Sequence, residues 1–434
     1  MKKYILNMAW MLGDRVLMLL FQLTLFSSIK RVYGIDILGG WATINNLSQI
    51  LISFFMLGID IIVVKKIVES PLDAGKEIGS AIAIQICGVV LYSCALYFLV
   101  ENYYSNIENA STYVCIFILA NFFSIFAKSV YFHYIALVES KYRAISIISS
   151  IILAFIFLFY SLLFNRDALF FTYAVYYIIQ AFISVLVYVA YFKKKSKWKV
   201  NIYLAKEYLF IGLKLVVSTV SVSIFAQADT LMLEKLSGVG EAGAFSAALR
   251  VSTIWFFCAG IIANAFFPII VKLKDKESNL FLIRWMISVT TSITIVVSII
   301  VSFISMYIMS FLYGDGMALS ANILTIHIWS SVFIFMGAFS SKWLYAKNDI
   351  NIDIYKTISA AILNVTLNYF IIPLYGAVGA ACVSMLSYVF ANLVFFYFVK
   401  RVRVMFWIQV EAILGGLNPA KLIREYKDVK CLFL

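Results

Sequence analysis

The stretch GIDILGGW, Gly34–Trp41, follows the first long apolar run of the chain, and GVGEAGAF, Gly238–Phe245, follows the seventh. Both stretches read glycine, four residues, glycine, one residue and then an aromatic residue, and their first glycines are 204 positions apart. Each stretch begins the second predicted helix of one half of the chain. The repeat therefore predicts a molecule built from two similar halves of six helices each.

The apolar runs around these stretches predict a membrane protein. Hydrophobic residues make up 63% of the 434 positions and charged residues 13%, whereas soluble domains are about half apolar and a quarter charged. Crossing a bilayer as a helix takes about 20 apolar residues, and these runs are continuous rather than alternating, which excludes barrel strands. We predict an all-α integral membrane protein with twelve transmembrane helices. The expected spans are 7–29, 39–63, 78–100, 112–137, 144–164, 168–192, 209–233, 242–271, 282–311, 323–345, 354–373 and 377–398.

The basic segment KKKSKWK, Lys193–Lys199, separates the first six spans from the last six. Such a segment also sets topology and attracts anionic lipid headgroups. We expect an N-terminal six-helix lobe at 1–192, a basic cytoplasmic linker at 193–208, a C-terminal six-helix lobe at 209–398 and a basic interfacial tail at 399–434. Because six spans return the chain to one side, the lobes are expected to be related by a pseudo-two-fold axis along the membrane normal, as in many transporters.

The distribution of basic residues predicts the orientation. With the N-terminus inside, 27 of the 35 lysines and arginines fall in inside segments, four in outside loops and four within spans. Cytoplasmic loops carry such an excess, so both termini are expected in the cytoplasm. The positive charge is thereby explained without a nucleic-acid partner. The outside loops are short, so function is expected to lie among the helices.

Basic residues within the spans are the first candidates for a binding site. A charge at the bilayer centre costs about 2.5–3.5 kcal/mol, and such residues face a cavity or pair with an acid. Their excess over the acidic residues suits an anionic substrate such as a phosphate. An ion pair for Arg15 and snorkelling to the interface for Lys214 are the structural alternatives. The candidate substrate-binding residues are Arg15, Lys128, Lys214 and Arg250.

The acidic residue Asp14 precedes Arg15 directly. Adjacent helical residues point about 100° apart and do not face each other. Asp14 therefore either holds a neighbouring helix or is a proton site. Asp60, near the inner end of the second span, reads as interfacial, and it is also a gating candidate.

A second intramembrane acid lies in the C-terminal half. Asp229 and Arg250 both fall in the outer parts of consecutive spans, where they can meet as an ion pair, a gate or both. Gln22 shares the face of Arg15. Gln22, Asn46 and Gln227 are candidate polar cavity residues, although many such residues only join helices.

Enzymatic signatures are missing from the sequence. The two histidines, His133 and His327, lie in different halves without metal-ligand spacing, and the six cysteines are scattered. No Gly-rich phosphate loop or nucleophile elbow occurs. We therefore expect neither catalysis, nor a bound metal, nor a cofactor.

Several stretches together resemble a known family. They are WMLGDRVLMLLFQLTL, YGIDILGGWATINNLSQILISFFMLGIDIIVVKKI, YFHYIALVESKYRAI, FAQADTLMLEKLSGVGEAGAFSAALRVSTIWFF and PLYGAVGAACVS. Through them the chain resembles the Wzx-type polysaccharide repeat-unit flippases of the multidrug/oligosaccharidyl-lipid/polysaccharide exporter superfamily. The likeness covers most of the chain, through motifs that are individually loose.

The resemblance implies a function and its partners. A V-shaped pair of lobes would carry an oligosaccharide on undecaprenyl pyrophosphate to the outer leaflet of the bacterial inner membrane by alternating access, for O-antigen or other surface polysaccharide. The deep basic residues would contact pyrophosphate or acidic sugars, and Asp14 or Asp229 would carry a coupling proton or sodium ion. Expected partners are membrane lipids, a polysaccharide polymerase and a chain-length regulator. The alternative is a cation or drug antiporter of the same fold.

Overall fold

The computed structural model describes residues 2–137, 139–192, 198–272 and 276–415, which are helical almost throughout. Helices suit a bilayer because each satisfies its own backbone hydrogen bonds where water is absent. Within those ranges, ten helical segments are long and apolar enough to cross a membrane.

Two features of the helices reconcile these ten segments with the twelve predicted spans. The segment Ile350–Phe398 has 49 residues and is interrupted at Gly376, where φ is 53° and ψ is −141°, so it comprises two spans. Helix α2 (Ile35–Phe55) is also long enough, but Asn45, Asn46 and other polar residues lower its hydropathy. The predicted all-α membrane fold of twelve spans is confirmed.

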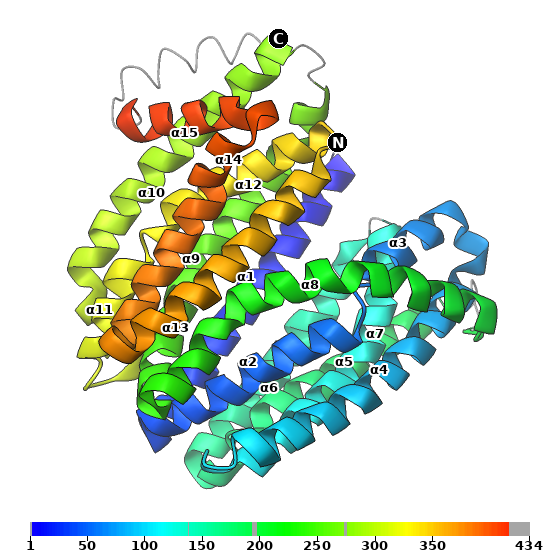
Figure 1. Cartoon of the computed structure of the whole chain (residues 1–434). Helices are drawn as coiled ribbons and strands as arrows, with labels where there is room; N and C mark the ends of the chain where they lie inside the picture. Colours follow the sequence, from blue (N-terminus) through cyan, green and yellow to red (C-terminus); the bar gives the residue numbers. More distant parts are fainter. Residues whose placement is uncertain (1, 138, 193–197, 273–275, 416–434) are drawn as a thin grey trace. The chain divides into compact units, whose positions relative to one another are not determined.

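The first compact unit covers Met1–Gln227. Its helices are α1 (Lys2–Tyr33), α2, α3 (Asp60–Glu69), α4 (Ala74–Tyr103), α5 (Ala110–Ala136), α6 (Ser140–Phe164) and α7 (Phe171–Phe192). Helix α5 packs against α4 and α7, and α6 packs against α1 and α7 (Figure 1). An aromatic core between α1, α5, α6 and α7 includes Phe21, Tyr131, Tyr134 and Tyr176.

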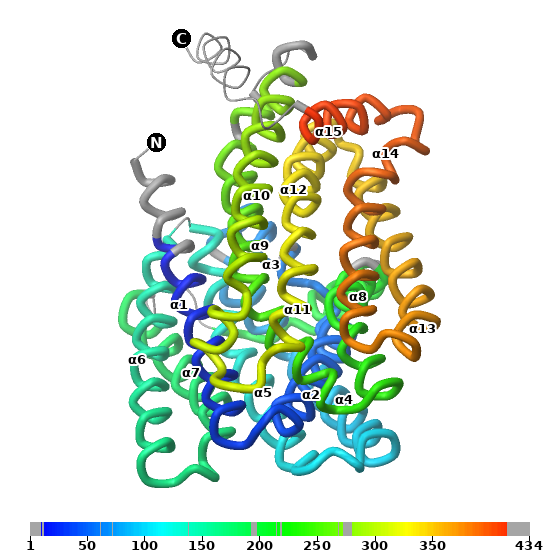
Figure 2. Tube along the Cα trace, turned by 90° about the vertical axis from the view of Figure 1, so that its left-hand side faces the viewer, coloured from blue at the N-terminus to red at the C-terminus, as the bar shows by residue number. Residues whose placement is uncertain are grey.

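The second compact unit covers Ala228–Leu434. Its helices are α9 (Val239–Lys272), α10 (Lys276–Tyr313), α11 (Ala318–His327), α12 (Ser330–Ala346), α13 (Ile350–Val389), α14 (Phe395–Phe398) and α15 (Arg403–Gly415). A short π-helical turn, Phe390–Val394, joins α13 to α14. Helices α9, α10 and α12 pack together, and α11 and α12 both contact α13 (Figure 2).

Helix α8 (Ile202–Ser237) contains the last residues of the first unit and the first residues of the second. The units therefore divide between Gln227 and Ala228, whereas the predicted linker lies at 193–208. Residues 193–197 of that linker are outside the described part of the chain.

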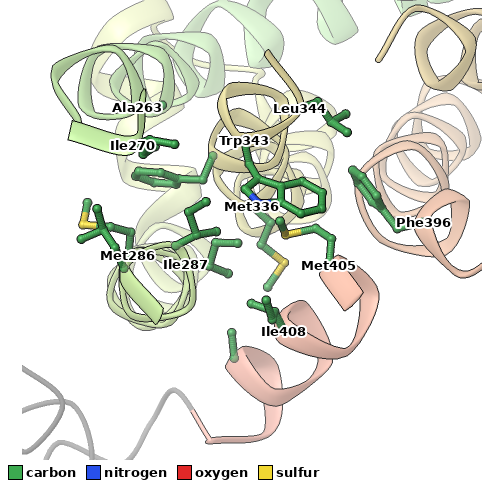
Figure 3. Packing of buried hydrophobic residues seen from close by; sticks show 14 of the residues in the cluster. Ala263, Ile270, Met286, Ile287, Met336, Trp343, Leu344, Phe396, Met405 and Ile408 are labelled. Atoms are coloured by element: carbon green, nitrogen blue, oxygen red, sulfur yellow. The ribbon is translucent and has the colours of Figure 1, made fainter. Parts of the chain in front are cut away.

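The expected tail, 399–434, contains a helix that docks on the second unit. Helix α15 lies across α10 (Figure 1). Met405 and Ile408 of α15 are buried in a cluster with Met336 and Trp343 of α12 and with Ile287 of α10 (Figure 3). Residues 416–434 lie outside the described ranges.

The repeated motif of the sequence has the same local structure in both units. Gly34 and Gly238 both have a left-handed backbone, with φ of 95° and 100°. Helix α2 begins directly after the first glycine and α9 directly after the second. The aromatic residues that end the motifs, Trp41 and Phe245, are both completely buried. The sequence repeat is thus a repeat of structure.

These two glycines should be costly to replace. A side chain in the left-handed region costs roughly 1–2 kcal/mol, and a Cβ on either glycine would contact nothing within 4 Å, so the backbone alone sets the penalty. We expect Gly34→Ala and Gly238→Ala each to lower the unfolding free energy by about that amount, measured as a lower melting temperature of the purified protein.

The control is Gly260→Ala, a helical position with equally open space around its Cβ. Alanine there should raise helix stability by about 0.5–1 kcal/mol. Equal melting temperatures for all three variants would contradict the conformational explanation.

Candidate functional site

The neighbours Asp14 and Arg15 of α1 point to different surroundings. Asp14 is 1% exposed, whereas Arg15 is exposed. The carboxylate of Asp14 lies 3.4 Å from Nε of Arg143, at the start of α6. Asp14 was predicted either to contact a neighbouring helix or to be a proton site, and its position shows the first of these, a contact to α6. The sequence analysis placed Arg143 in the loop between the spans 112–137 and 144–164, whereas in the structure α6 already begins at Ser140.

Aromatic side chains surround this ion pair. The guanidinium of Arg143 lies over the ring of Tyr131, 5.5 Å from its centroid. Ser184 of α7 donates a hydrogen bond of 3.2 Å to the Tyr131 hydroxyl. Both oxygens of Asp14 are buried without a hydrogen bond from any described residue. The pair is therefore held mainly by Coulomb attraction in a nonpolar setting, where that attraction is strong.

A second polar cluster lies where the second span of the first unit breaks. Gln85 of α4 donates to the Asp60 carboxylate at 3.4 Å, and Ser129 of α5 donates to Gln85 at 3.4 Å. Lys128 of α5 is exposed and acts electrostatically on Asp60. The sequence offered Lys128 no acid on its own helix and placed Asp60 beside lysines of α3. The structure adds a contact that the sequence did not show, because the helix break places Asp60 beside α4 and α5.

The break itself is a tight, specific structure. Helix α2 ends at Phe55, and Leu57 and Gly58 are both left-handed, with φ of 60°. Leu57 is buried although this conformation is unfavourable for a side chain. A Cβ on Gly88 of α4 would lie 2.4 Å from the Phe55 carbonyl oxygen, so only glycine permits this approach. The packing of α4 thus fixes where α3 starts and where Asp60 points.

A third polar cluster, in the second unit, surrounds Asp229 of α8. Nδ2 of Asn368 donates to one carboxylate oxygen at 2.7 Å and to Oδ1 of Asn364 at 3.2 Å. The hydroxyl of Ser384 donates to the other carboxylate oxygen. All four residues are buried. Helix α8 supplies the acid, and both halves of the broken helix α13 supply its partners.

This Asp229 cluster gathers oxygen atoms around one charge. Oδ1 of Asn368 and Nδ2 of Asn364 have no hydrogen-bond partner among the described residues. The buried carboxylate and the two amide oxygens are ligands of the kind that hard cations take. Protonation of the carboxylate is the other way to neutralise a buried acid. The sequence showed these asparagines only as an i, i+4 pair within an apolar run.

The remaining candidate residues take different positions. Arg250 of α9 is half-buried and acts electrostatically on the buried Tyr313 of α10. Gln22 and Gln227 are half-buried. Asn46 is buried and accepts a hydrogen bond of 3.4 Å from Asn45.

The backbone of Lys214 lies in α8, but its side chain falls outside the described part of the chain. The candidate residues Asp14 and Asp60 of the first unit lie in two different polar clusters, and Asp229 lies in a third cluster in the second unit. Within the described ranges, no group of three or more His, Cys, Asp and Glu side chains is placed to hold a metal ion.

One network outside the spans anchors the start of α8 to α4. The Tyr208 hydroxyl donates to the carboxylate of Glu77, and Lys66 of α3 pairs with Glu207 at 2.6 Å. Burial, together with the neighbouring Glu77 carboxylate, raises the pKa of Tyr208 above its usual value. The phenol therefore stays protonated and remains a hydrogen-bond donor.

Comparison with known proteins identifies relatives of the sequence. Residues 7–274 match the family model described as "Polysaccharide biosynthesis protein". The "Capsular polysaccharide biosynthesis protein CapF" of Staphylococcus aureus is 25% identical over 215 residues, which are 49% of this chain and 54% of that protein. The chain thus aligns with about half the length of this curated relative.

Two solved structures share the fold. A "Lipid II flippase MurJ, inward closed conformation" superposes with a TM-score of 0.72 at 15% identity, covering 99% of this chain and 97% of the other. An inward-facing multidrug resistance MATE family transporter of the MOP superfamily superposes with a TM-score of 0.69 at 12% identity, covering 94% and 95%. At such identities the likeness establishes the fold alone.

The Asp14–Arg143 pair yields a stability prediction. Removing one partner of a buried ion pair leaves the other charge uncompensated, at a cost of roughly 3–5 kcal/mol. We expect Asp14→Ala and Arg143→Ala each to lower the unfolding free energy by up to about that amount, and the double variant to recover much of the loss. A double-mutant cycle of melting temperatures measures this coupling.

The matched control is Arg15→Ala, which changes the exposed neighbour of Asp14. It should leave the coupling between Asp14 and Arg143 intact. Additive losses in the cycle would show that the two residues do not stabilise each other.

Proposed function

Because the chain belongs to the polysaccharide biosynthesis protein family, we propose that it is a flippase for lipid-linked oligosaccharide repeat units. The cargo is an oligosaccharide on undecaprenyl pyrophosphate, moved from the cytoplasmic to the outer leaflet of the bacterial inner membrane for O-antigen or capsule synthesis. The family match over residues 7–274 carries the proposal. Twelve spans with little chain outside them suit a protein whose work is done within the bilayer.

The charges within the spans support an anionic cargo. Arg15 and Lys128 are exposed side chains on membrane-spanning helices of the first unit. Exposed cations at membrane depth are costly, and functional sites are where such residues are retained. A pyrophosphate carries the charge that offsets this cost, since charge-assisted hydrogen bonds to phosphate are among the strongest. We assign Arg15, Lys128 and Arg250 to headgroup contact during translocation, with Lys214 as a fourth candidate.

Coupling to an ion is assigned to Asp229. Its buried carboxylate lies among amide and hydroxyl groups of α13. Binding of a proton or a sodium ion would neutralise the charge and rearrange those hydrogen bonds. Helix α8 contains Asp229 and continues through Gln227 into the first unit. A movement of α8 caused by ion binding at this carboxylate would therefore involve residues of both units. Asp14, already paired with Arg143, is the weaker coupling candidate.

The membrane topology and partners follow from this role. Both termini lie in the cytoplasm, on the side where the basic segments gather. The translocated repeat unit then passes to a polysaccharide polymerase, with a chain-length regulator, on the outer side. These proteins act on the same lipid-linked product.

A drug or cation antiporter of the same fold is the second candidate. The fold is shared with a multidrug resistance transporter about as closely as with a lipid II flippase, so the fold is compatible with either function. The basic residues within the spans favour the flippase, because a cation exporter is better served by acidic side chains in its pathway.

The experiment that separates the two is complementation. The gene, expressed with its cognate glycan pathway in a strain that lacks its own repeat-unit flippase, should restore surface polysaccharide. Absence of surface polysaccharide, together with export of cationic drugs from vesicles, would overturn the proposal in favour of the antiporter.

Variants within this assay test the headgroup contacts. We expect Lys128→Ala to lower surface polysaccharide at least tenfold, which corresponds to a loss of about 1.4 kcal/mol in transition-state stabilisation. Lys128→Arg is the matched control, because it keeps the charge and should retain most of the export. Immunoblotting must show equal amounts of protein in the membrane. Full export by Lys128→Ala and Arg15→Ala would contradict the cationic headgroup site.

A further variant tests ion coupling. Asp229→Asn keeps the size of the side chain but removes its charge and its proton. We expect export to become independent of the imposed ion gradient and to fall, while Asn46→Ala leaves the gradient dependence intact. Transport by vesicles under opposed proton and sodium gradients measures the effect and identifies the ion. Unchanged gradient dependence in Asp229→Asn would exclude this carboxylate as the coupling site.

A further inference from the structure

The internal repeat extends past the six spans of each unit. At the same separation of 204 positions, KVNIYLAKEYLFI (199–211) aligns with RVMFWIQVEAILG (403–415). The first stretch ends the linker and begins α8, and the second is α15. Both begin with a basic residue and valine, and both continue through an aromatic residue to a glutamate.

Each stretch is anchored to the equivalent helix of its own unit. In the first unit, the Asn201 backbone exchanges hydrogen bonds of 3.0 and 3.3 Å with Ser80 of α4. In the second, Met405 and Ile408 of α15 are buried in a cluster that includes Ile287 of α10. Both stretches therefore dock by one face at the end of the third span.

The opposite face is exposed and apolar in both stretches. Its repeating positions have the spacing i, i+3, i+7 and i+10, which in α15 places them along one side of the helix, whereas in the first stretch the first position precedes the start of α8. Tyr203 is 85% exposed and its counterpart Trp407 is 54% exposed. The other matched positions, which are also exposed, are Val200 with Val404, Glu207 with Glu411 and Phe210 with Leu414.

An exposed aromatic and apolar face at the ends of membrane helices is suited to contact the membrane interface. Tryptophan and tyrosine gather where hydrocarbon meets headgroups, and helices with such a face lie in that plane. Basic residues accompany each stretch, with KKKSKWK before the first and Lys400, Arg401 and Arg403 at the second. Their charge complements the anionic lipids of the same leaflet.

We propose that residues 199–211, which lead into α8, and helix α15 are a duplicated pair of interfacial segments whose exposed faces, centred on Tyr203 and Trp407, bind anionic phospholipid at the membrane interface. Each fixes the end of its own six-helix unit to one leaflet. One face of each segment packs against its own unit, and the opposite face contacts lipid. Binding of lipid by these faces is independent of the transported substrate.

Fluorescence quenching of the full-length protein tests the proposal. The protein is reconstituted into vesicles of phosphatidylcholine and phosphatidylglycerol, with bromine atoms near the headgroup end of the acyl chains of one lipid. Trp407→Phe should remove a strongly quenched part of the tryptophan emission. Trp343→Phe is the control, since Trp343 is 1% exposed inside the protein and its removal should leave the quenched part unchanged.

Two further arms test the duplication and the lipid charge. Tyr203→Trp should add a quenched component like that of Trp407. Brominated phosphatidylglycerol should quench Trp407 more than the same share of brominated phosphatidylcholine, and Lys400→Gln should reduce this difference. Equal quenching in wild type and Trp407→Phe would overturn the proposal and indicate that another protein surface covers α15. Equal quenching by the two lipids would contradict the anionic preference.

Discussion

Inside lipid a backbone must satisfy its own hydrogen bonds, and this requirement shapes the molecule wherever a helix is interrupted. At Gly376, which breaks α13, Glu241 of α9 accepts a hydrogen bond of 2.7 Å from the backbone nitrogen of Ala377. That glutamate belongs to the repeated motif that begins α9. In the first unit, where α2 ends, the Met56 backbone donates to Ile52, and Gly88 of α4 lies against the Phe55 carbonyl. Each interruption is paired with a specific partner, and each brings polar side chains to a defined place.

The buried acidic side chains within the spans also have specific partners. Asp14 is paired with Arg143 across α1 and α6, and Asp229 is bound by Asn368 and Ser384 of α13. A buried charge needs such partners, because the desolvation free energy of an unpaired buried charge is far larger than the free energy gained from one hydrogen bond. The two acids differ in kind. Asp14 has an arginine beside it, whereas the hydrogen bonds to Asp229 come from the neutral side chains of Asn368 and Ser384.

The sequence predicted the features that depend on periodicity and composition. Spans, helical class and the internal repeat follow from apolar runs and from the glycine spacing at Gly34 and Gly238. The resemblance to a family of polysaccharide biosynthesis proteins is confirmed by the family match. Partners across helices could not be read in this way. Arg143 was assigned to a loop, and Lys128 was placed without its neighbour Asp60, because both contacts depend on where a helix breaks or begins. The docking of α15 was also missed, since its buried and exposed faces are both largely apolar.

Transport of the lipid-linked headgroup is the central claim, and it is tested most directly with purified components. The protein is reconstituted into sealed vesicles that contain undecaprenyl pyrophosphate bearing a fluorescent oligosaccharide in the inner leaflet. A membrane-impermeant quencher added outside then reports the arrival of the headgroup. We expect an inward-directed cation gradient to speed quenching in protein-containing vesicles relative to protein-free vesicles. Equal rates in the two kinds of vesicle, with the protein folded and inserted, would contradict it.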